Sequence, residues 1–366
     1  EDLFGRISLS NGTTLGLAEL DNNGDGVIDG GDRGVVLQED GLLIDIAALA
    51  RFHHADRFDP LGPSTLLLDG IQELTVDDFM RRPTEGADEI VATSAADTLR
   101  LGGGDDVARG AEGDDVLMGE AGNDRLLGEA GNDVLAGGAG DDLLSGGSGA
   151  NRLMGGEGSD FLEGSGQPGA SGDFMAGGAG NDRIQGGRGN DVIQGGDGDD
   201  ALAGRRGSNQ VWGGAGDDLI EIGMDDRIHA GIGDDVVQVA SRRDHEYVRR
   251  SEITLGSGQD RFEMTGKADE RYGRGFHTLL DFRPGEDLLG ELGFGEGRTI
   301  GFAELDGNGD GVVDQRDQGV GFSQGGLMIN LHQVAEQTHG AFTMNGPSAL
   351  RLVGVDALRP EDFVQG

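Results

Sequence analysis

The sequence predicts an all-β protein with a long repetitive centre between two related, mainly-β modules. Three observations lead to this prediction. A nine-residue repeat rich in glycine and aspartate fills residues 101–238, an apolar residue returns at the same phase of each repeat, and the two ends of the chain are copies of one another. Glycine takes 73 of 366 positions and proline only 7, which excludes a proline-rich linker, and 35% hydrophobic residues leave enough apolar side chains for a core.

The composition is strongly acidic. Aspartate and glutamate number 68 against 28 lysines and arginines, which gives a formal charge of -40. This sign repels phosphate, so nucleic acid is not an expected partner. Forty excess negative charges also repel one another in a compact fold, so we expect bound divalent metal ions to supply the compensating positive charge. Because the chain has no cysteine, disulfides and thiolate zinc sites are excluded, and oxygen-ligand metal sites are the ones to look for.

The nine-residue repeat fits fifteen blocks, of which Gly137–Ser145 is a regular example. Position eight is apolar in every block, from Ala108 to Val237. A flexible glycine and aspartate linker has no reason to keep that phase, so the segment is predicted to fold. Position six is always aspartate or asparagine, and these residues are the candidate metal ligands: Asp106, Asp115, Asp124, Asp133, Asp142, Asn151, Asp160, Asp173, Asp182, Asp191, Asp200, Asn209, Asp218, Asp226 and Asp235.

Alternate blocks differ in how regular they are. Every second block has aspartate at position six, and we call these residues the strict row: Asp106, Asp124, Asp142, Asp160, Asp182, Asp200, Asp218 and Asp235. The remaining seven, the relaxed row, include Asn151, Asn209, a four-residue insertion around Gln167 and Pro168, and a shortened block before Asp226. This segregation predicts an eighteen-residue coil in which every second block stacks on the same edge, with one strict and one relaxed metal-binding edge.

The blocks resemble the GGxGxDxUx nonapeptide of the RTX family of calcium-binding bacterial proteins. The resemblance implies that six residues of each block form a turn that holds Ca²⁺, that three form a short strand, and that two blocks make one turn of a parallel β-roll. The residue types agree, because glycine lets carbonyl oxygens converge and aspartate supplies the hard anionic oxygen that Ca²⁺ prefers. It also implies multiple calcium ions, the type I secretion machinery as a partner, and a secreted, extracellular or cell-surface location.

Both ends of the roll are predicted to be capped, because open ends expose unpaired backbone. Asp88 and Asp97 keep the nine-residue phase before the glycines begin, and Leu255–Phe262 forms one more motif after it, with Asp260 as a candidate ligand. The basic residues 242–243 and 249–250 are interpreted as an electrostatic cap, with contact to a surface polysaccharide as the alternative. The predicted domains are residues 1–85, 86–265 and 266–366.

The flanking modules carry a second oxygen-rich pattern. Glu1–Leu3 returns as Glu286–Leu288, and since the counterpart of Leu279–Gly285 would precede Glu1, the natural chain is expected to extend upstream. Each copy has the spacing of an EF-hand loop, although position twelve is aspartate rather than glutamate and a predicted hairpin replaces the exiting helix. The candidate ligands are Asp21, Asn23, Asp25, Val27, Asp29 and Asp32 in the first copy, and Asp306, Asn308, Asp310, Val312, Asp314 and Asp317 in the second.

The motifs point to a binding function rather than an enzyme, because the sequence has neither a zinc-protease HExxH nor a GxSxG nucleophile motif. Without a run of about 18 apolar residues, membrane insertion is not expected. The favoured function is a calcium-binding structural segment of a large secreted or surface protein, such as an adhesin, that folds after export. The alternatives are the secretion and folding domain of an RTX protease or lipase, and a calcium-triggered self-processing module that cleaves at Asp59–Pro60. Self-association is a further possible interaction.

Overall fold

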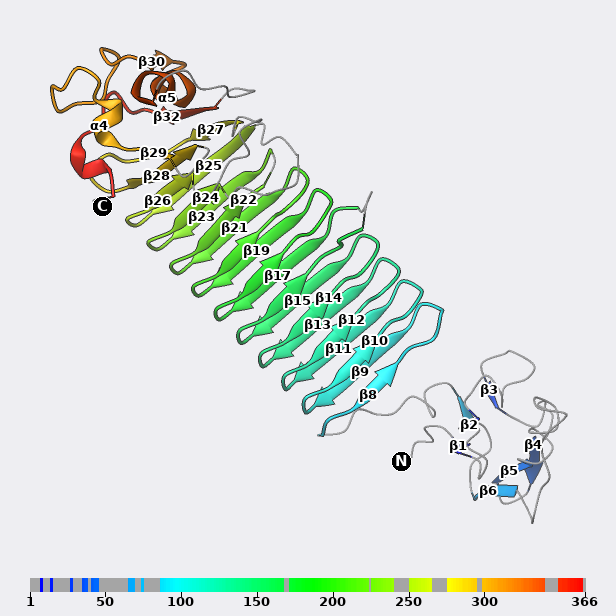
Figure 1. The fold of residues 1–366 in the computed structure, drawn as a ribbon. Helices are drawn as coiled ribbons and strands as arrows, with labels where there is room; N and C mark the ends of the chain where they lie inside the picture. The colour runs from blue at the N-terminus through cyan, green and yellow to red at the C-terminus, as the bar shows by residue number, and fades with distance from the viewer. Residues whose placement is uncertain are drawn as a thin grey trace. The chain divides into compact units, whose positions relative to one another are not determined.

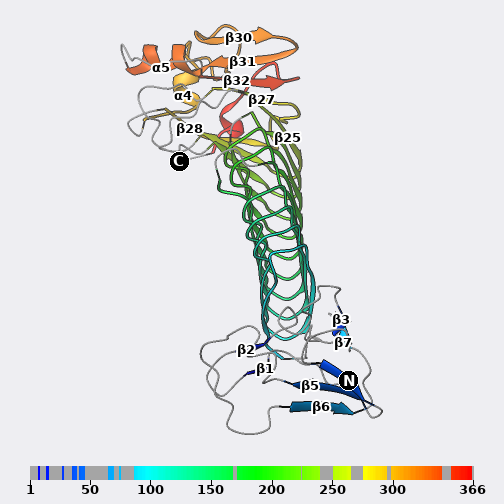
Figure 2. The same ribbon diagram turned by 90° about the vertical axis from the view of Figure 1, so that its right-hand side faces the viewer.

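The computed structural model describes residues 86–167, 171–223, 225–239, 250–264, 275–294, 298–339 and 348–364, together with seven short strands between residues 7 and 75. The chain divides into two compact units, Glu1–Pro83 and Thr84–Gly366. The second unit is dominated by a parallel β-solenoid of stacked turns, seen from two directions in Figures 1 and 2.

The solenoid consists of two long sheets, and successive blocks contribute strands to them in alternation. In the first sheet, each strict-row aspartate is followed directly by a strand, and further strands continue the sheet at both ends. Its strands are β8 (Glu89–Val91), β10 (Val107–Arg109), β12 (Arg125–Leu127), β14 (Leu143–Ser145), β16 (Phe161–Glu163), β18 (Arg183–Gln185), β20 (Ala201–Ala203), β22 (Leu219–Ile222), β24 (Val236–Val239), β26 (Arg261–Met264), β28 (Leu288–Phe294) and β29 (Arg298–Ile300). The second sheet contains β9 (Thr98–Gly103), β11 (Val116–Ala121), β13 (Val134–Ala139), β15 (Arg152–Glu157), β17 (Phe174–Ala179), β19 (Val192–Asp197), β21 (Gln210–Ala215), β23 (Arg227–Ile232), β25 (Arg250–Ser257), β27 (Gly275–Leu279), β32 (Ser348–Val353), β31 (Gly326–Asn330) and β30 (Val320–Ser323).

The register of the strands confirms the eighteen-residue coil. Within each sheet, regular blocks pair in parallel with the block two repeats away, so that Leu126 lies opposite Leu144 and Leu135 opposite Leu153. The apolar side chain at position eight is buried in all fifteen blocks, with an exposure of 1% or less. These side chains form a narrow core, as the fixed phase in the sequence predicts. The first turns before the glycines, with β8 and β9, pair in the same register.

The glycine turns bring neighbouring backbones very close together. Gly140, at position four, has a φ of +129°, and a Cβ atom added there would lie 2.1 Å from the carbonyl oxygen of Gly122 in the preceding turn. Such a φ is open to glycine and to few other residues, and no side-chain atom fits against that carbonyl. Glycine at residue 140 is therefore a requirement of the stacking between these two turns.

The C-terminal part continues both sheets. Strands β27 and β28 pair in parallel with β25 and β26, and the hairpin of β30 and β31, which the sequence predicts around Gly325 and Gly326, then adds to β32. Two helices, α4 (Phe302–Leu305) and α5 (Leu331–His339), and a 3₁₀ turn, η1 (Pro360–Asp362), complete this region.

Helix α5 is an element that the sequence analysis did not predict. Leu331, Val334 and Ala335 are all buried, at the spacing that puts side chains on one face of a helix, and α5 packs on β29 and β32. No helix in the described ranges is long and apolar enough to span a bilayer.

In the N-terminal unit the structure describes strands alone: β1 (Ile7–Ser8), β2 (Thr14–Leu15), β3 (Val27–Ile28), β4 (Val35–Gln38), β5 (Gly41–Asp45), β6 (Thr65–Asp69) and β7 (Leu74–Thr75). Strands β4 and β5 form the predicted hairpin, and β6 pairs with β5. Apart from Val27, the candidate ligands of the first EF-like loop lie outside the described residues, as do Asp59–Pro60 and the basic residues 242, 243 and 249. The three-part domain division and the relation of the flanking modules stay predictions.

Candidate metal centre

The position-six side chains form two hydrogen-bonded ladders along the edges of the roll. In the strict row, the backbone N–H of each aspartate donates to Oδ1 of the aspartate one turn later, as from Asp124 to Asp142 and from Asp142 to Asp160, both at 2.8 Å. The relaxed row follows the same pattern, with Asp133 donating to Oδ1 of Asn151 at 2.9 Å. One side-chain oxygen of each residue, a carboxylate or an amide oxygen, is thus used to hold the neighbouring turn in register.

The second carboxylate oxygen of the strict-row aspartates takes no part in the ladder. From Asp106 to Asp235, every strict-row aspartate is at most 3% exposed, and its Oδ2 atom has no hydrogen-bond partner; the same is true of Asp260, one turn after the row. A buried ionised oxygen without a partner costs free energy, so a row of them calls for a cation.

The oxygens beside these Oδ2 atoms fit calcium. A Cβ atom added at Gly119 would lie 2.1 Å from Oδ2 of Asp124 and 2.6 Å from the carbonyl oxygen of Gly137. Two strict blocks later, Gly155 has the same surroundings, formed by Asp160 and Gly177. Carboxylate and carbonyl oxygens therefore face one small space beside each of these glycines. Hard oxygens of both kinds are the ligands that Ca²⁺ takes. Among the described residues, no three carboxylates, imidazoles or thiols gather at one point.

In the relaxed row, two of the Oδ2 atoms accept a backbone hydrogen bond. Oδ2 of Asp173 accepts the backbone N–H of Ser165 at 2.8 Å, and Oδ2 of Asp226 accepts that of Gly223 at 2.6 Å. The insertion and the shortened block provide these donors. Asn151, where the row lacks a charge, leaves its Nδ2 without a hydrogen-bond partner. In this row, Asp115, Asp133 and Asp191 keep an unpartnered Oδ2 like the strict row.

Burial of the rows changes their proton affinity. Desolvation raises the pKa of Asp142, Asp182, Asp200 and Asp235 from 3.8 to about 7, although each carboxylate also accepts a backbone hydrogen bond that lowers it. Neighbouring carboxylates raise the pKa further. The folded roll thus favours either a proton or a cation at each position.

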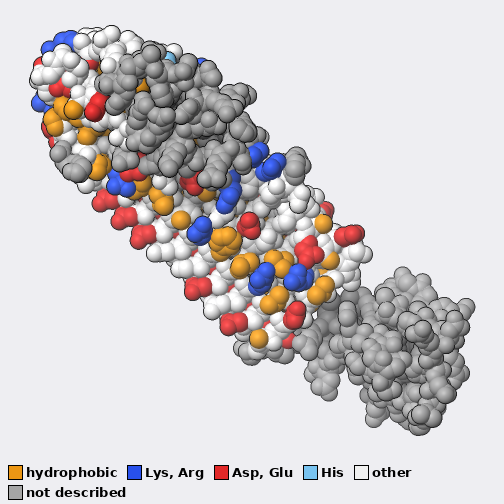
Figure 3. Space-filling view, viewed as in Figure 1, with side chains coloured by type: hydrophobic (Ala, Val, Ile, Leu, Met, Phe, Trp, Pro, Cys, Tyr) orange, Lys and Arg blue, Asp and Glu red, His pale blue; other side chains and the backbone are white. Residues whose placement is uncertain are grey.

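Sequence analysis missed a second ladder at position five. Here the backbone N–H of the later turn donates to the side-chain oxygen of the earlier one, opposite to position six, at 2.7–3.0 Å: Asn123 to Asp105, Asp141 to Asn123, Ser159 to Asp141, Asp199 to Asn181, Asp217 to Asp199, Asp234 to Asp217 and Gln259 to Asp234. The recurrence of aspartate and asparagine at this phase is the signal that could have revealed it. These side chains are exposed, and Figure 3 shows acidic side chains in a line along one edge of the roll.

The second EF-like loop lies between α4 and β30. Asp306 at position one accepts the backbone N–H groups of Gly309, Asp310 and Gly311, which folds the loop around its side chain. The guanidinium of Arg316 lies 3.0 Å from Asp310 and 2.6 Å from Asp314, so it bridges positions five and nine. Asn308 donates its backbone N–H to the position-twelve side chain, Asp317, at 3.2 Å. Ligation of calcium by this loop and by its N-terminal copy stays a prediction.

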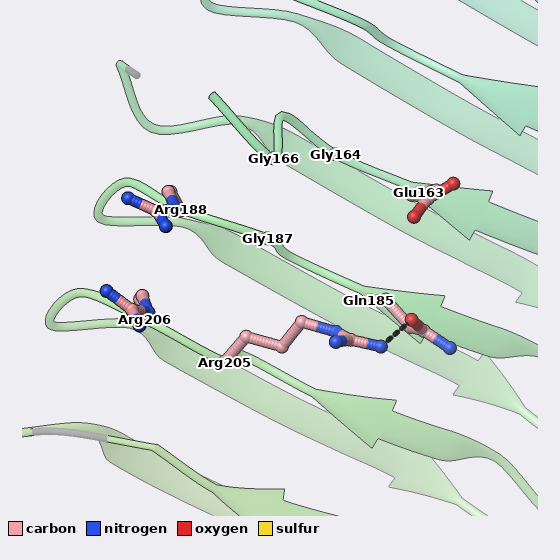
Figure 4. A pocket seen from close by; sticks show the side chains of 8 residues that line it. All are labelled: Glu163, Gly164, Gly166, Gln185, Gly187, Arg188, Arg205 and Arg206. Carbon is pink, nitrogen blue, oxygen red and sulfur yellow. Dashed lines mark hydrogen bonds between the residues drawn. The ribbon is translucent and has the colours of Figure 1, made fainter. Parts of the chain in front are cut away.

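A hollow of about 220 Å³, lined by three arginines, lies near the insertion (Figure 4). Arg188 and Arg206 lie opposite each other on neighbouring turns, and the guanidinium of Arg205 hydrogen-bonds Oε1 of Gln185. Glu163 lines the same hollow. A guanidinium has no free lone pair with which to ligate a cation, so the arginines of this hollow are not metal ligands.

Comparison with protein families agrees with this geometry. The family model of the RTX calcium-binding nonapeptide repeat matches residues 84–117, 109–144, 145–167, 169–202, 176–211, 194–225 and 225–238. The solenoid is built of RTX calcium-binding repeats. No curated protein matches the chain. RTX repeats bind calcium and are typical of secreted bacterial proteins, and an RTX roll is a structural calcium-binding fold rather than a catalytic one.

Proposed function

We propose that this chain is a structural segment of a large secreted or cell-surface protein, and that its RTX roll folds by binding several calcium ions after export. The ions would be held by the position-six residues of the strict row and by the relaxed-row aspartates with an unpartnered Oδ2. The observation that carries the proposal is the row of buried carboxylate oxygens without hydrogen-bond partners, several of which lie beside a glycine carbonyl, as at Asp124, Asp160 and Asp200. The two EF-like loops are proposed as additional calcium sites.

Electrostatics explains why folding would depend on calcium. Carboxylates stacked about 5 Å apart repel by roughly 0.8 kcal/mol per pair even at the dielectric constant of water, and by more in a protein. At a net charge of -40, the chain without calcium is expected to stay expanded, a state suited to passage through the type I secretion machinery. Millimolar calcium outside the cell would then supply charge and ligands, so that binding free energy becomes folding free energy.

A reciprocal pair of substitutions tests the assignment of the rows. Asp142→Asn keeps the Oδ1 acceptor for Asp124 but removes the charge, so we expect the calcium concentration at half-folding to rise about tenfold, equivalent to about 1.4 kcal/mol. Asn151→Asp adds a carboxylate at the matching place in the relaxed row, and we expect it to lower that concentration. Far-ultraviolet circular dichroism during a calcium titration measures both effects.

Asp197→Asn serves as the control, because this aspartate lies at the end of β19, at position three of its block, outside both ladders. We expect its midpoint to stay within about twofold of the unmodified chain. If Asp142→Asn and Asn151→Asp shift the midpoint in the same direction, or neither shifts it, the proposed ligand rows are wrong.

A further inference from the structure

The strict row continues one turn further than the repeats themselves. The backbone N–H of Leu288 donates to the carbonyl oxygen of Asp260 at 2.7 Å, and that of Asp260 points to Oδ1 of Asp287 at 3.4 Å. Both aspartates are fully buried, with 0% exposure. Asp287 therefore occupies position six of a final turn, although the residues around it no longer follow the nonapeptide.

At this final pair of carboxylates, a cationic side chain of the chain itself is present. Nη2 of Arg283 lies 3.8 Å from Oδ2 of Asp260 and 3.8 Å from Oδ1 of Asp287, and it also hydrogen-bonds the carbonyl oxygen of Gly256. Oδ2 of Asp260 has no hydrogen-bond partner, as in the rest of the strict row. Nη2 of Arg283 thus lies among two stacked carboxylates and a glycine carbonyl. Carboxylate and glycine carbonyl oxygens also face one another inside the roll, as beside Gly119.

The position of Arg283 follows from a local turn. The backbone N–H groups of Glu286 and Asp287 donate to its carbonyl oxygen, and its own N–H donates to Oδ2 of Asp287 at 2.7 Å. Its Nε lies 3.4 Å from the carboxylate of Glu286, and its side chain is 38% exposed. The turn thus holds the guanidinium at the end of the row, with one side open to solvent.

We infer that the guanidinium of Arg283 takes the place of a calcium ion at the end of the strict row, and that Asp260, Asp287 and Gly256 form a latent calcium site that opens when the arginine is removed. This inference rests on the proposed function, since it requires that the interior of the row binds calcium. A guanidinium is always charged and covalently attached, so it places one positive charge beside the last carboxylate pair at any calcium concentration and offsets half of their negative charge.

Counting bound calcium in the full chain tests the inference. We expect Arg283→Gln, saturated with calcium and freed of excess ion by gel filtration, to hold one more ion per chain than the unmodified protein by atomic emission. Arg261→Gln is the matched control, because Arg261 pairs with Glu263 at 2.7 Å and does not reach the row, and its count is expected to stay unchanged. An unchanged count in folded Arg283→Gln overturns the inference.

A second pair of variants keeps the inference testable if Arg283→Gln does not fold. Asp287→Asn is expected to leave the number of bound ions unchanged, because no calcium is held there, whereas Asp235→Asn in the interior of the row is expected to lose calcium. Loss of an ion in Asp287→Asn overturns the inference even when Asp235→Asn behaves as expected. If the unmodified chain binds no calcium, the proposed function itself fails, which is a separate result from equal counts in the two proteins.

Discussion

Removing calcium with EGTA, followed by exchange into calcium-free buffer at pH 7, is expected to abolish the β-structure of the roll, and acidification of this calcium-free protein toward pH 4 is expected to restore it. The reason is the buried carboxylates, whose pKa desolvation raises from 3.8 to about 7 at Asp142, Asp200 and Asp235. Between pH 3.8 and about pH 7, these carboxylates bind more protons in the folded chain than in the unfolded chain. Stability without calcium is therefore fully present below about pH 4 and is lost as the pH rises through 7.

The calcium-bound protein is expected to respond to pH in the opposite way. Protons compete with calcium for the same oxygens, so the calcium concentration at half-folding should rise as the pH falls from 7. Circular dichroism at low protein concentration follows both effects, and hydrodynamic radius reports the expansion. Magnesium at equal concentration is the control, since its small octahedral shell suits these turns poorly. A roll that keeps its spectrum in EGTA at pH 7 would falsify calcium-coupled folding.

Gly140→Ala is expected to destabilise the calcium-saturated protein by about 3 kcal/mol or more. Its Cβ would lie 2.1 Å from the carbonyl oxygen of Gly122, which is backbone and cannot move without separating two turns, and alanine also resists the φ of +129°. Urea unfolding at saturating calcium measures the loss.

Gly285→Ala separates the two causes of that loss. Gly285 also has a positive φ, of +84°, but a Cβ added there meets no atom within 4 Å, so we expect a cost of only about 1 kcal/mol from backbone strain. Equal losses in the two variants would show that contact between stacked turns contributes nothing at Gly140.

The regular part of the site was predictable because it follows from translation along one axis. A period of nine with an apolar position eight predicts the core from Ala108 to Val237, and the alternation of strict and relaxed blocks predicts which position-six residues stack. Every contact of this kind joins residues at a constant separation of two blocks, so repetition in the sequence carries the information. The same logic would have revealed the position-five ladder.

The sequence by itself determined the coil, its core and the two edges of carboxylates, because a repeat that cannot bury its apolar face alone must stack on its neighbours. The tertiary structure decided where the repeat is broken. Closure of Asp173 by the N–H of Ser165, the place of Asp287 in the strict row and the contact of Arg283 with Asp260 all depend on turns of irregular length. Since no period relates these residues, three-dimensional packing alone brings them together.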